Sequence, residues 1–195
     1  MGLYDSADKA AKDNPVTFIG SDGVPTVGYC KMTPMKLEVA RKTAKYNRLG
    51  TLPRDHKRQA GDWVQIDEDW YIVGNISPDM YRGQVIRYNS ELMYVTDVVT
   101  VYRPTVTKDA THGGVTGQTL LPVEVDAKVL ITTSDMFVEG PREEDVGDWF
   151  LYWSIHLPPL RPKDRLEYRG KALEVKFERY DTLGVVMYRL KEANV

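Results

Sequence analysis

Alternation of apolar and polar side chains with a period of two constrains this chain more than any other feature of its sequence. It is clearest in the apolar residues Trp149, Leu151, Trp153, Ile155 and Leu157. The same alternation recurs in residues 123–131 and 173–177. This period indicates strands with one buried and one wet face, which is typical of antiparallel sheets. Because no long helical pattern separates these segments, a parallel α/β sheet is disfavoured.

The composition agrees with a folded β protein. The chain has 195 residues, of which 42% are hydrophobic and 28% charged, and this suffices for one ordinary domain or two small ones. Twelve tyrosines and four tryptophans suit strands, and fifteen glycines and eleven prolines suit the turns between them. We therefore expect a mainly β fold, an antiparallel barrel or sandwich, formed by residues 61–195.

The first 60 residues are expected to form an arm, a hairpin and a short basic helix. Residues 16–19 and 24–29 flank Ser21-Asp22-Gly23, and this arrangement predicts a hairpin. A threonine cap, a proline in the first turn and a glycine and a proline beyond the last turn predict a helix over residues 34–48. A weaker pattern predicts a second helix over residues 4–12.

Charge and cysteine content exclude several classes of protein. The formal net charge of -2 does not suit a protein that wraps nucleic acid with its whole surface. The single cysteine, Cys30, cannot form an internal disulfide or a four-thiolate zinc site, and we expect it to be a buried thiol. No apolar run is long enough for a membrane-spanning helix, and the first residues lack the layout of a secretion signal. Assembly in the cytoplasm is expected.

Positive charge is concentrated between residues 31 and 58. This segment has nine Lys and Arg residues and two acidic residues, in a chain whose net charge is -2. It could contact DNA phosphates or an acidic protein partner, and the alternative is a solvated helix face. The candidate contact residues are Lys36, Arg41, Lys42, Lys45, Arg48, Arg54, Lys57 and Arg58.

Two acidic clusters complement this segment. Neither has the spacing of a calcium loop, and both are expected on exposed turns where nothing raises a carboxyl pKa. They could be solubilising turns, or they could meet the basic segment of a neighbouring subunit and orient it. The candidate inter-subunit residues are Asp67, Glu68, Asp69, Glu143, Glu144 and Asp145.

No catalytic residue, metal site or cofactor is predicted. His56, His112 and His156 lack ligand spacing, and His156 is expected on the outer face of a strand. Residues 104–118 read as a long loop, whose glycines lack the phosphate-loop pattern. A hydrolase site in this loop stays an alternative that only geometry could support.

The tryptophans allow two interpretations. Trp63, Trp149 and Trp153 alternate with other residues in strand patterns and are expected to fill the core. The alternative is an aromatic platform that binds single-stranded nucleic acid.

Two windows of the chain resemble each other. Asp62 and Asp164, and Asp79 and Asp181, are each 102 positions apart, and a similar strand, turn and strand follow each member of the first pair. The first window continues to Gly83 and Tyr88, and the second to Gly184 and Tyr188. Each window predicts a three-stranded meander, whether or not the chain arose by duplication.

The second window carries a family resemblance. Residues 162–175, with the sequence Pro-Lys-Asp-Arg-Leu-Glu-Tyr-Arg-Gly-Lys-Ala-Leu-Glu-Val, resemble the carboxyl-terminal β module of head-closure proteins, which form the neck between head and tail of tailed bacteriophages. Residues 61–73 are similar. The resemblance implies a virion structural protein without catalytic activity. It further implies a homo-oligomeric ring below the portal that docks the tail and retains packaged DNA.

Two other functions remain open. The chain could be a β protein of the phage tail or baseplate, or a small β-barrel protein that binds nucleic acid. Portal, adaptor and tail proteins are the expected partners, and no membrane contact is expected.

Overall fold

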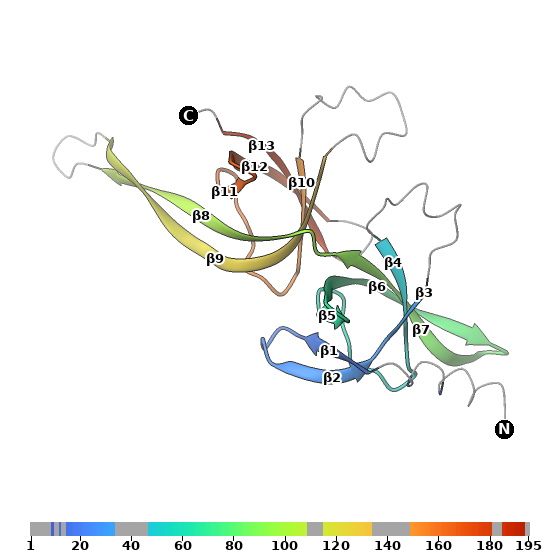
Figure 1. Cartoon of the computed structure of the whole chain (residues 1–195). Helices are drawn as coiled ribbons and strands as arrows, with labels where there is room; N and C mark the ends of the chain where they lie inside the picture. Colours follow the sequence, from blue (N-terminus) through green and yellow to red (C-terminus); the bar gives the residue numbers. More distant parts are fainter. Residues whose placement is uncertain are drawn as a thin grey trace, which may run out of the picture.

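The computed structural model describes residues 9, 12, 15–33, 47–108, 115–133, 149–180 and 185–193. Thirteen strands in this part of the chain form two adjoining β structures, and all the strand pairs among them are antiparallel (Figure 1). The fold is therefore mainly β, as the alternation predicted. No helix in the described residues is long and apolar enough to cross a bilayer.

The amino-terminal half forms a seven-stranded sheet with the order β2-β1-β5-β6-β7-β4-β3. Its strands are β1 (Pro15–Ile19), β2 (Pro25–Tyr29), β3 (Lys31–Thr33), β4 (Asn47–Leu52), β5 (Trp63–Ile66), β6 (Asp69–Tyr81) and β7 (Gln84–Tyr94). The predicted hairpin around Asp22 is confirmed as β1 and β2. The two edge strands, β2 and β3, follow each other in the chain with only Cys30 between them, so the sheet curls until its edges adjoin.

The carboxyl-terminal half is a closed six-stranded barrel with the order β10-β13-β12-β11-β8-β9. Its strands are β8 (Asp97–Lys108), β9 (Val115–Thr133), β10 (Trp149–Trp153), β11 (Arg165–Tyr168), β12 (Lys171–Tyr180) and β13 (Val186–Glu192). The meander predicted at the carboxyl end is present as β11, β12 and β13.

The two halves share one pattern of strand pairing. In the sheet, β5 pairs with β1 and β6, and β7 pairs with β6 and β4; in the barrel, β11 pairs with β8 and β12, and β13 pairs with β12 and β10. The long strand β9 takes the place of β2 and β3 together, so the barrel is closed by one continuous strand. At the offset of 102 positions, Pro78 of the sheet corresponds to Tyr180 of the barrel. Tyr88 pairs with Pro78, whereas Val186 pairs with Tyr180, so the match of Tyr88 with Tyr188 in the sequence is wrong.

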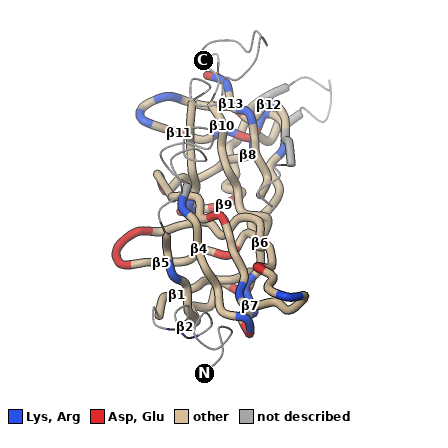
Figure 2. The backbone as a smooth tube through the Cα atoms, turned by 90° about the vertical axis from the view of Figure 1, so that its right-hand side faces the viewer, with Lys and Arg blue, Asp and Glu red and all other residues tan. Residues whose placement is uncertain are grey.

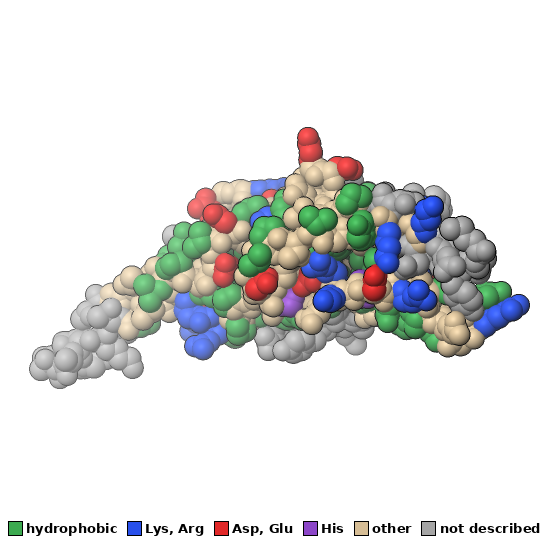
Figure 3. All heavy atoms as spheres, turned by 90° about the horizontal axis from the view of Figure 1, so that it is seen from below, with side chains coloured by type: hydrophobic (Ala, Val, Ile, Leu, Met, Phe, Trp, Pro, Cys, Tyr) green, Lys and Arg blue, Asp and Glu red, His purple; other side chains and the backbone are tan. Residues whose placement is uncertain are grey.

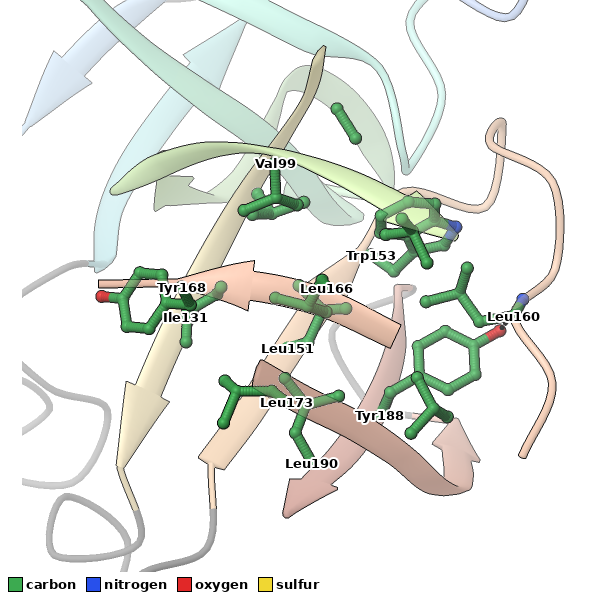
Figure 4. Close-up of a cluster of buried hydrophobic side chains, with 14 of the residues drawn as sticks. Val99, Ile131, Leu151, Trp153, Leu160, Leu166, Tyr168, Leu173, Tyr188 and Leu190 are labelled. Carbon is green, nitrogen blue, oxygen red and sulfur yellow. Dashed lines mark hydrogen bonds between the residues drawn. The ribbon is translucent and has the colours of Figure 1, made fainter. Parts of the chain in front are cut away.

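Three apolar clusters hold the molecule together. One fills the barrel and includes Leu151, Trp153 and Tyr188 (Figure 4). A second fills the curled sheet and includes Phe18 and Cys30. The third lies between the halves, where side chains of β5, β6 and β7 meet those of β9 and β10; its buried members are Trp63, Ile72, Met93, Leu130, Phe150, Tyr152 and Val185. The core role predicted for the tryptophans is confirmed for Trp153, whereas Trp63 packs between the two halves.

Several local predictions differ from the structure. Residues 104–108 and 115–118 are strand, so the expected 104–118 loop is wrong for them, and residues 109–114 lie outside the described part. Most of the expected helix 34–48 is also outside that part, but its last two positions, Asn47 and Arg48, belong to β4. The expected boundary at residue 60 falls between β4 and β5, which belong to one sheet.

Bulges explain where alternation failed. Val125 precedes Asp126, which has a positive φ of 55°, and the Val125 side chain is exposed instead of buried. Phe177 follows a register shift after Val175 and is likewise exposed. An extra residue in one strand turns the following side chains to the other face, so the period of two does not continue through it.

Candidate interaction surfaces

A buried aspartate organises the same turn in each half. The Asp62 carboxylate accepts a hydrogen bond from the Gln59 amide at 3.0 Å, and its carbonyl accepts one from the Val73 amide at 2.7 Å. In the barrel, the Asp164 carboxylate accepts a bond from the Arg161 amide at 2.7 Å, and its carbonyl accepts one from Val175 at 2.8 Å. The partners are 102 positions apart in every case. The repeat seen in the sequence is therefore a shared hydrogen-bonded frame.

The two aspartates differ in their cationic partner. Asp164 binds Arg103 of its own barrel through both oxygens, at 2.9 and 2.8 Å. These hydrogen bonds raise the pKa of the Arg103 guanidinium, so Arg103 stays charged. Asp62 instead contacts Nε2 of His156, at 2.9 Å, and His156 belongs to the other half. The Asp62 frame therefore joins the two halves, whereas the Asp164 frame stays within one.

Further polar contacts complete this joint. Ser154 donates its hydroxyl to the Gly61 carbonyl at 2.6 Å in a buried position, and Trp63 donates its indole N–H to the Lys128 carbonyl at 3.2 Å. Gly61 has a positive φ of 92°, and a Cβ there would lie 2.6 Å from the Ile155 side chain, so only glycine fits. The expectation that His156 lies on a strand is wrong, because β10 ends at Trp153 and His156 sits in the turn that reaches Asp62.

Of the eight basic candidates, four can be placed. Arg48 is in β4, and Arg54, Lys57 and Arg58 lie in the connection between β4 and β5. Arg58 lies over the Phe18 ring at 4.4 Å and donates to the Thr26 hydroxyl at 2.8 Å. Lys36, Arg41, Lys42 and Lys45 lie outside the described residues.

Two of the four placed basic residues border a hollow of about 420 Å³ beside β2. Lys57 and Arg58 line it together with His56 and the Lys12–Asp55 ion pair. Burial and the nearby Arg58 charge lower the pKa of His56 below its usual value, while the hydrogen bond from Lys12 lowers the pKa of Asp55. His56 is therefore neutral near pH 7, and the positive charge of the hollow comes from Lys57 and Arg58.

The acidic candidates are only partly placed. Asp67 and Glu68 form the turn between β5 and β6, and Asp69 begins β6; all three residues are exposed, and Tyr94 donates its hydroxyl to Asp69 at 3.2 Å. The matching turn of the barrel contains Arg169 and Lys171 and is basic, and Figure 2 shows the acidic and basic turns on one side of the molecule. Glu143, Glu144 and Asp145 lie outside the described residues, so their proposed role stays a prediction.

Sequence reasoning located the two aspartates but missed their chemistry. Both were recognised as turn residues, yet neither their burial nor their partners could be read from the chain. His156 and Arg103 are 94 and 61 positions from the carboxylates they contact, so no local pattern links them. Within the described ranges, no three His, Cys, Asp or Glu residues are grouped as a metal site.

Cys30 agrees with its expected role. It is buried beside Phe18 and Leu92, and burial raises the pKa of its thiol to about 12. The thiolate is the reactive form of cysteine, so this thiol is unreactive at neutral pH.

No protein-family model, no curated protein and no solved structure matches this chain.

Proposed function

We propose that this chain is a structural protein of the bacteriophage neck, in which copies form a ring that joins the portal and capsid to the tail and helps retain packaged DNA. The observation that carries the proposal is the construction of the molecule. Two β structures of one topology are fixed to each other by an apolar cluster and buried hydrogen bonds, and long hairpins project from them. A molecule built in this way is suited to be a rigid subunit in the wall of a ring.

The resemblance of residues 61–73 and 162–175 to head-closure proteins supports a role for this chain in the virion neck. These segments form the repeated frame around Asp62 and Asp164, so they lie in the framework of the fold. Exposed apolar side chains on the projecting hairpins provide surfaces for neighbouring subunits.

Localisation in purified virions tests the proposal. Antibody or gold labelling should place the protein between capsid and tail, and its absence from mature particles would contradict a virion role. Labelling at the tail tip would support the alternative of a baseplate protein and would overturn the neck assignment.

Binding of nucleic acid is a second candidate, favoured by Lys57 and Arg58 beside the hollow. Electrostatic binding of DNA is strongest at low salt. A titration of labelled DNA against the intact protein at about 50 mM salt should then show binding that weakens in the Lys57→Glu/Arg58→Glu double variant. The matched control is Arg82→Glu, which changes an exposed charge in the turn between β6 and β7. Equal binding by both variants would exclude the hollow as the DNA contact.

A further inference from the structure

The hollow beside β2 has the size of a site for a small molecule. Its volume is about 420 Å³, and ligand pockets in proteins typically have about 300–1,000 Å³. β2 contributes Val27, Gly28 and Tyr29 to the lining, and the connection between β4 and β5 contributes Pro53 and residues 55–58. The β1–β2 hairpin is at the bottom of Figure 1. Figure 3 views the molecule from below and shows Lys and Arg side chains close together on that side.

Arg58 is held in this hollow without a charged partner. Its guanidinium lies over the Phe18 ring at 4.4 Å, and its Nη1 donates to the Thr26 hydroxyl at 2.8 Å. A Cβ at Gly28 would lie 2.8 Å from the Phe18 ring and 3.1 Å from Nη2 of Arg58, so the glycine makes room for this arrangement. In the described part of the chain, no carboxylate pairs with Arg58. A guanidinium fixed in this way is oriented to bind an oxyanion through two hydrogen bonds.

The charged side chains of the lining give the hollow an excess of positive charge. Lys12 and Asp55 offset each other in an ion pair at 3.0 Å. Lys57 and Arg58 supply two further positive charges, and no ion pair of Lys57 is found among the described residues. The Arg58 amide donates to Nδ1 of His56 at 3.1 Å, so the proton of the neutral imidazole is on Nε2, which is a further donor.

This excess matches a phosphate monoester better than other common anions. A monoester carries about −1.5 to −2 charges at pH 7, so it would neutralise Lys57 and Arg58 together. A carboxylate or a phosphodiester carries a single negative charge and would leave one of the two cations unpaired.

The hollow also has exposed apolar surface next to these cations. Val27 is 76% exposed and Tyr29 is 41% exposed, and both line the hollow. A bare inorganic anion would leave these two side chains in water. An apolar or aromatic group attached to the anion would cover them, and burial of apolar surface is favourable.

We propose that this hollow binds a phosphate monoester carried on a small apolar or aromatic group. The phosphate contacts Arg58 and Lys57, and the attached group lies against Val27 and Tyr29. The site goes beyond the proposed neck function and does not depend on it. It also differs from a contact along DNA, where each internal phosphodiester has one negative charge.

Titration of the full ¹⁵N-labelled chain with phenyl phosphate tests the site directly. At about 50 mM salt and about pH 7.5, we expect saturable shifts of the Gly28 and Arg58 amide signals in ¹H–¹⁵N spectra. The matched control is methyl phenyl phosphate, which retains the ring but has a single negative charge, and it should bind about fivefold more weakly. Inorganic phosphate lacks the ring and should also bind more weakly than phenyl phosphate. Equal binding of the three probes, or shifts confined to amides away from the hollow, would overturn the inference.

A substitution separates the geometry of the guanidinium from its charge. Arg58→Lys retains the charge but loses the paired hydrogen bonds, and should weaken binding of phenyl phosphate about tenfold or more. The matched control is Arg82→Lys, because Arg82 also lies over an aromatic ring, that of Tyr81 at 5.3 Å, but in the turn between β6 and β7. Unchanged binding by a folded Arg58→Lys variant would overturn the inference. If circular dichroism shows that this variant is unfolded, the three probes on the unsubstituted chain decide.

Two further probes identify the source of the monoester. Thymidine 5′-monophosphate represents a free nucleotide, and a short single-stranded oligonucleotide with a 5′-phosphate represents the end of a nucleic acid. Binding of either at the hollow supports the inference and names the source. An oligonucleotide that binds equally with and without its 5′-phosphate would overturn the inference, since the hollow would then contact phosphodiesters. Absence of the protein from virions would refute the neck function and leave these binding results unchanged.

Discussion

The two halves of this protein use one framework and present different surfaces. The turn between β5 and β6 and the turn between β11 and β12 are both two-residue connections, in which Asp67 and Arg169 have positive φ values of 56° and 52°. Trp63 pairs with Ile72 in the sheet as Arg165 pairs with Glu174 in the barrel. Both members of the first pair are buried between the halves.

The second pair is charged and only partly buried, with 35% of the Arg165 side chain and 14% of the Glu174 side chain exposed. Glu174 binds Arg165 at 3.5 Å and Lys176 at 2.6 Å, and the Lys176 hydrogen bond lowers the pKa of Glu174. The same backbone therefore carries an apolar docking face in one half and a charged face in the other. The difference shows why the β5–β6 face packs against the barrel, whereas the matching β11–β12 face forms ion pairs within its own half.

Exchanging these faces should have the largest effect. Ile72→Glu places in the joint the residue that the barrel has at the equivalent position, and an unpaired buried charge should reduce the free energy of unfolding by about 4 kcal/mol. Urea denaturation followed by tryptophan fluorescence measures the loss. The reciprocal change Glu174→Ile is the control and should lower stability less than Ile72→Glu, because its partners Arg165 and Lys176 are 35% and 39% exposed and can be hydrated without the carboxylate. Equal losses of unfolding free energy in the two variants would contradict the distinction between an apolar face on β5–β6 and a charged face on β11–β12.

Removing the Asp164 side chain should lower the free energy of unfolding more than replacing its carboxylate by an amide. Asp164→Ala leaves Arg103 without its carboxylate and the Arg161 amide without an acceptor, and we expect a loss of about 3 kcal/mol in urea denaturation. Asp164→Asn retains an acceptor for the amide and should lose less. If both variants are equally unstable, the loss comes from the ion pair with Arg103, and the acceptor for the Arg161 amide contributes nothing of its own.

The joint between the halves should be weaker than the frame of the barrel. His156→Ala removes the imidazole from Asp62 and should cost about 1 to 2 kcal/mol. Hydrogen exchange of the amides in β5 and β10 should rise more than exchange in β11 and β12, since the contact joins the halves. Uniform exchange throughout the chain would contradict a local role for this contact.

The smallest expected effect is a pH dependence specific to the sheet. Because burial and Arg58 lower the pKa of His56, the unfolded chain binds more protons than the folded chain as the pH falls through about 6.5. The free energy of unfolding should therefore decrease from pH 7 to pH 5. His56→Gln should remove part of this slope in denaturation at a series of pH values, and an unchanged slope would refute the assignment.

Local sequence patterns predicted which segments form strands better than they predicted where those strands end. The alternation in residues 149–153 and 173–175 correctly indicated strands, because their inward side chains meet one barrel core. It failed at Ile155, which is exposed beyond the end of β10. The glycine-containing segment 115–118 was read as loop, yet it is held in β9 by pairing with β8. Tertiary hydrogen bonds outweighed local propensity there.

The sequence by itself determined the antiparallel β class, the β1–β2 hairpin, the buried thiol and the spacing of 102 positions between two meanders, since these depend on local periodicity and turn chemistry. Only the tertiary structure decided that the chain closes one barrel and curls a second sheet. It alone brought His156 to Asp62 and Arg103 to Asp164. Contacts between residues so distant in the chain depend on the register of many strands, and a single bulge shifts that register without a clear mark in the sequence.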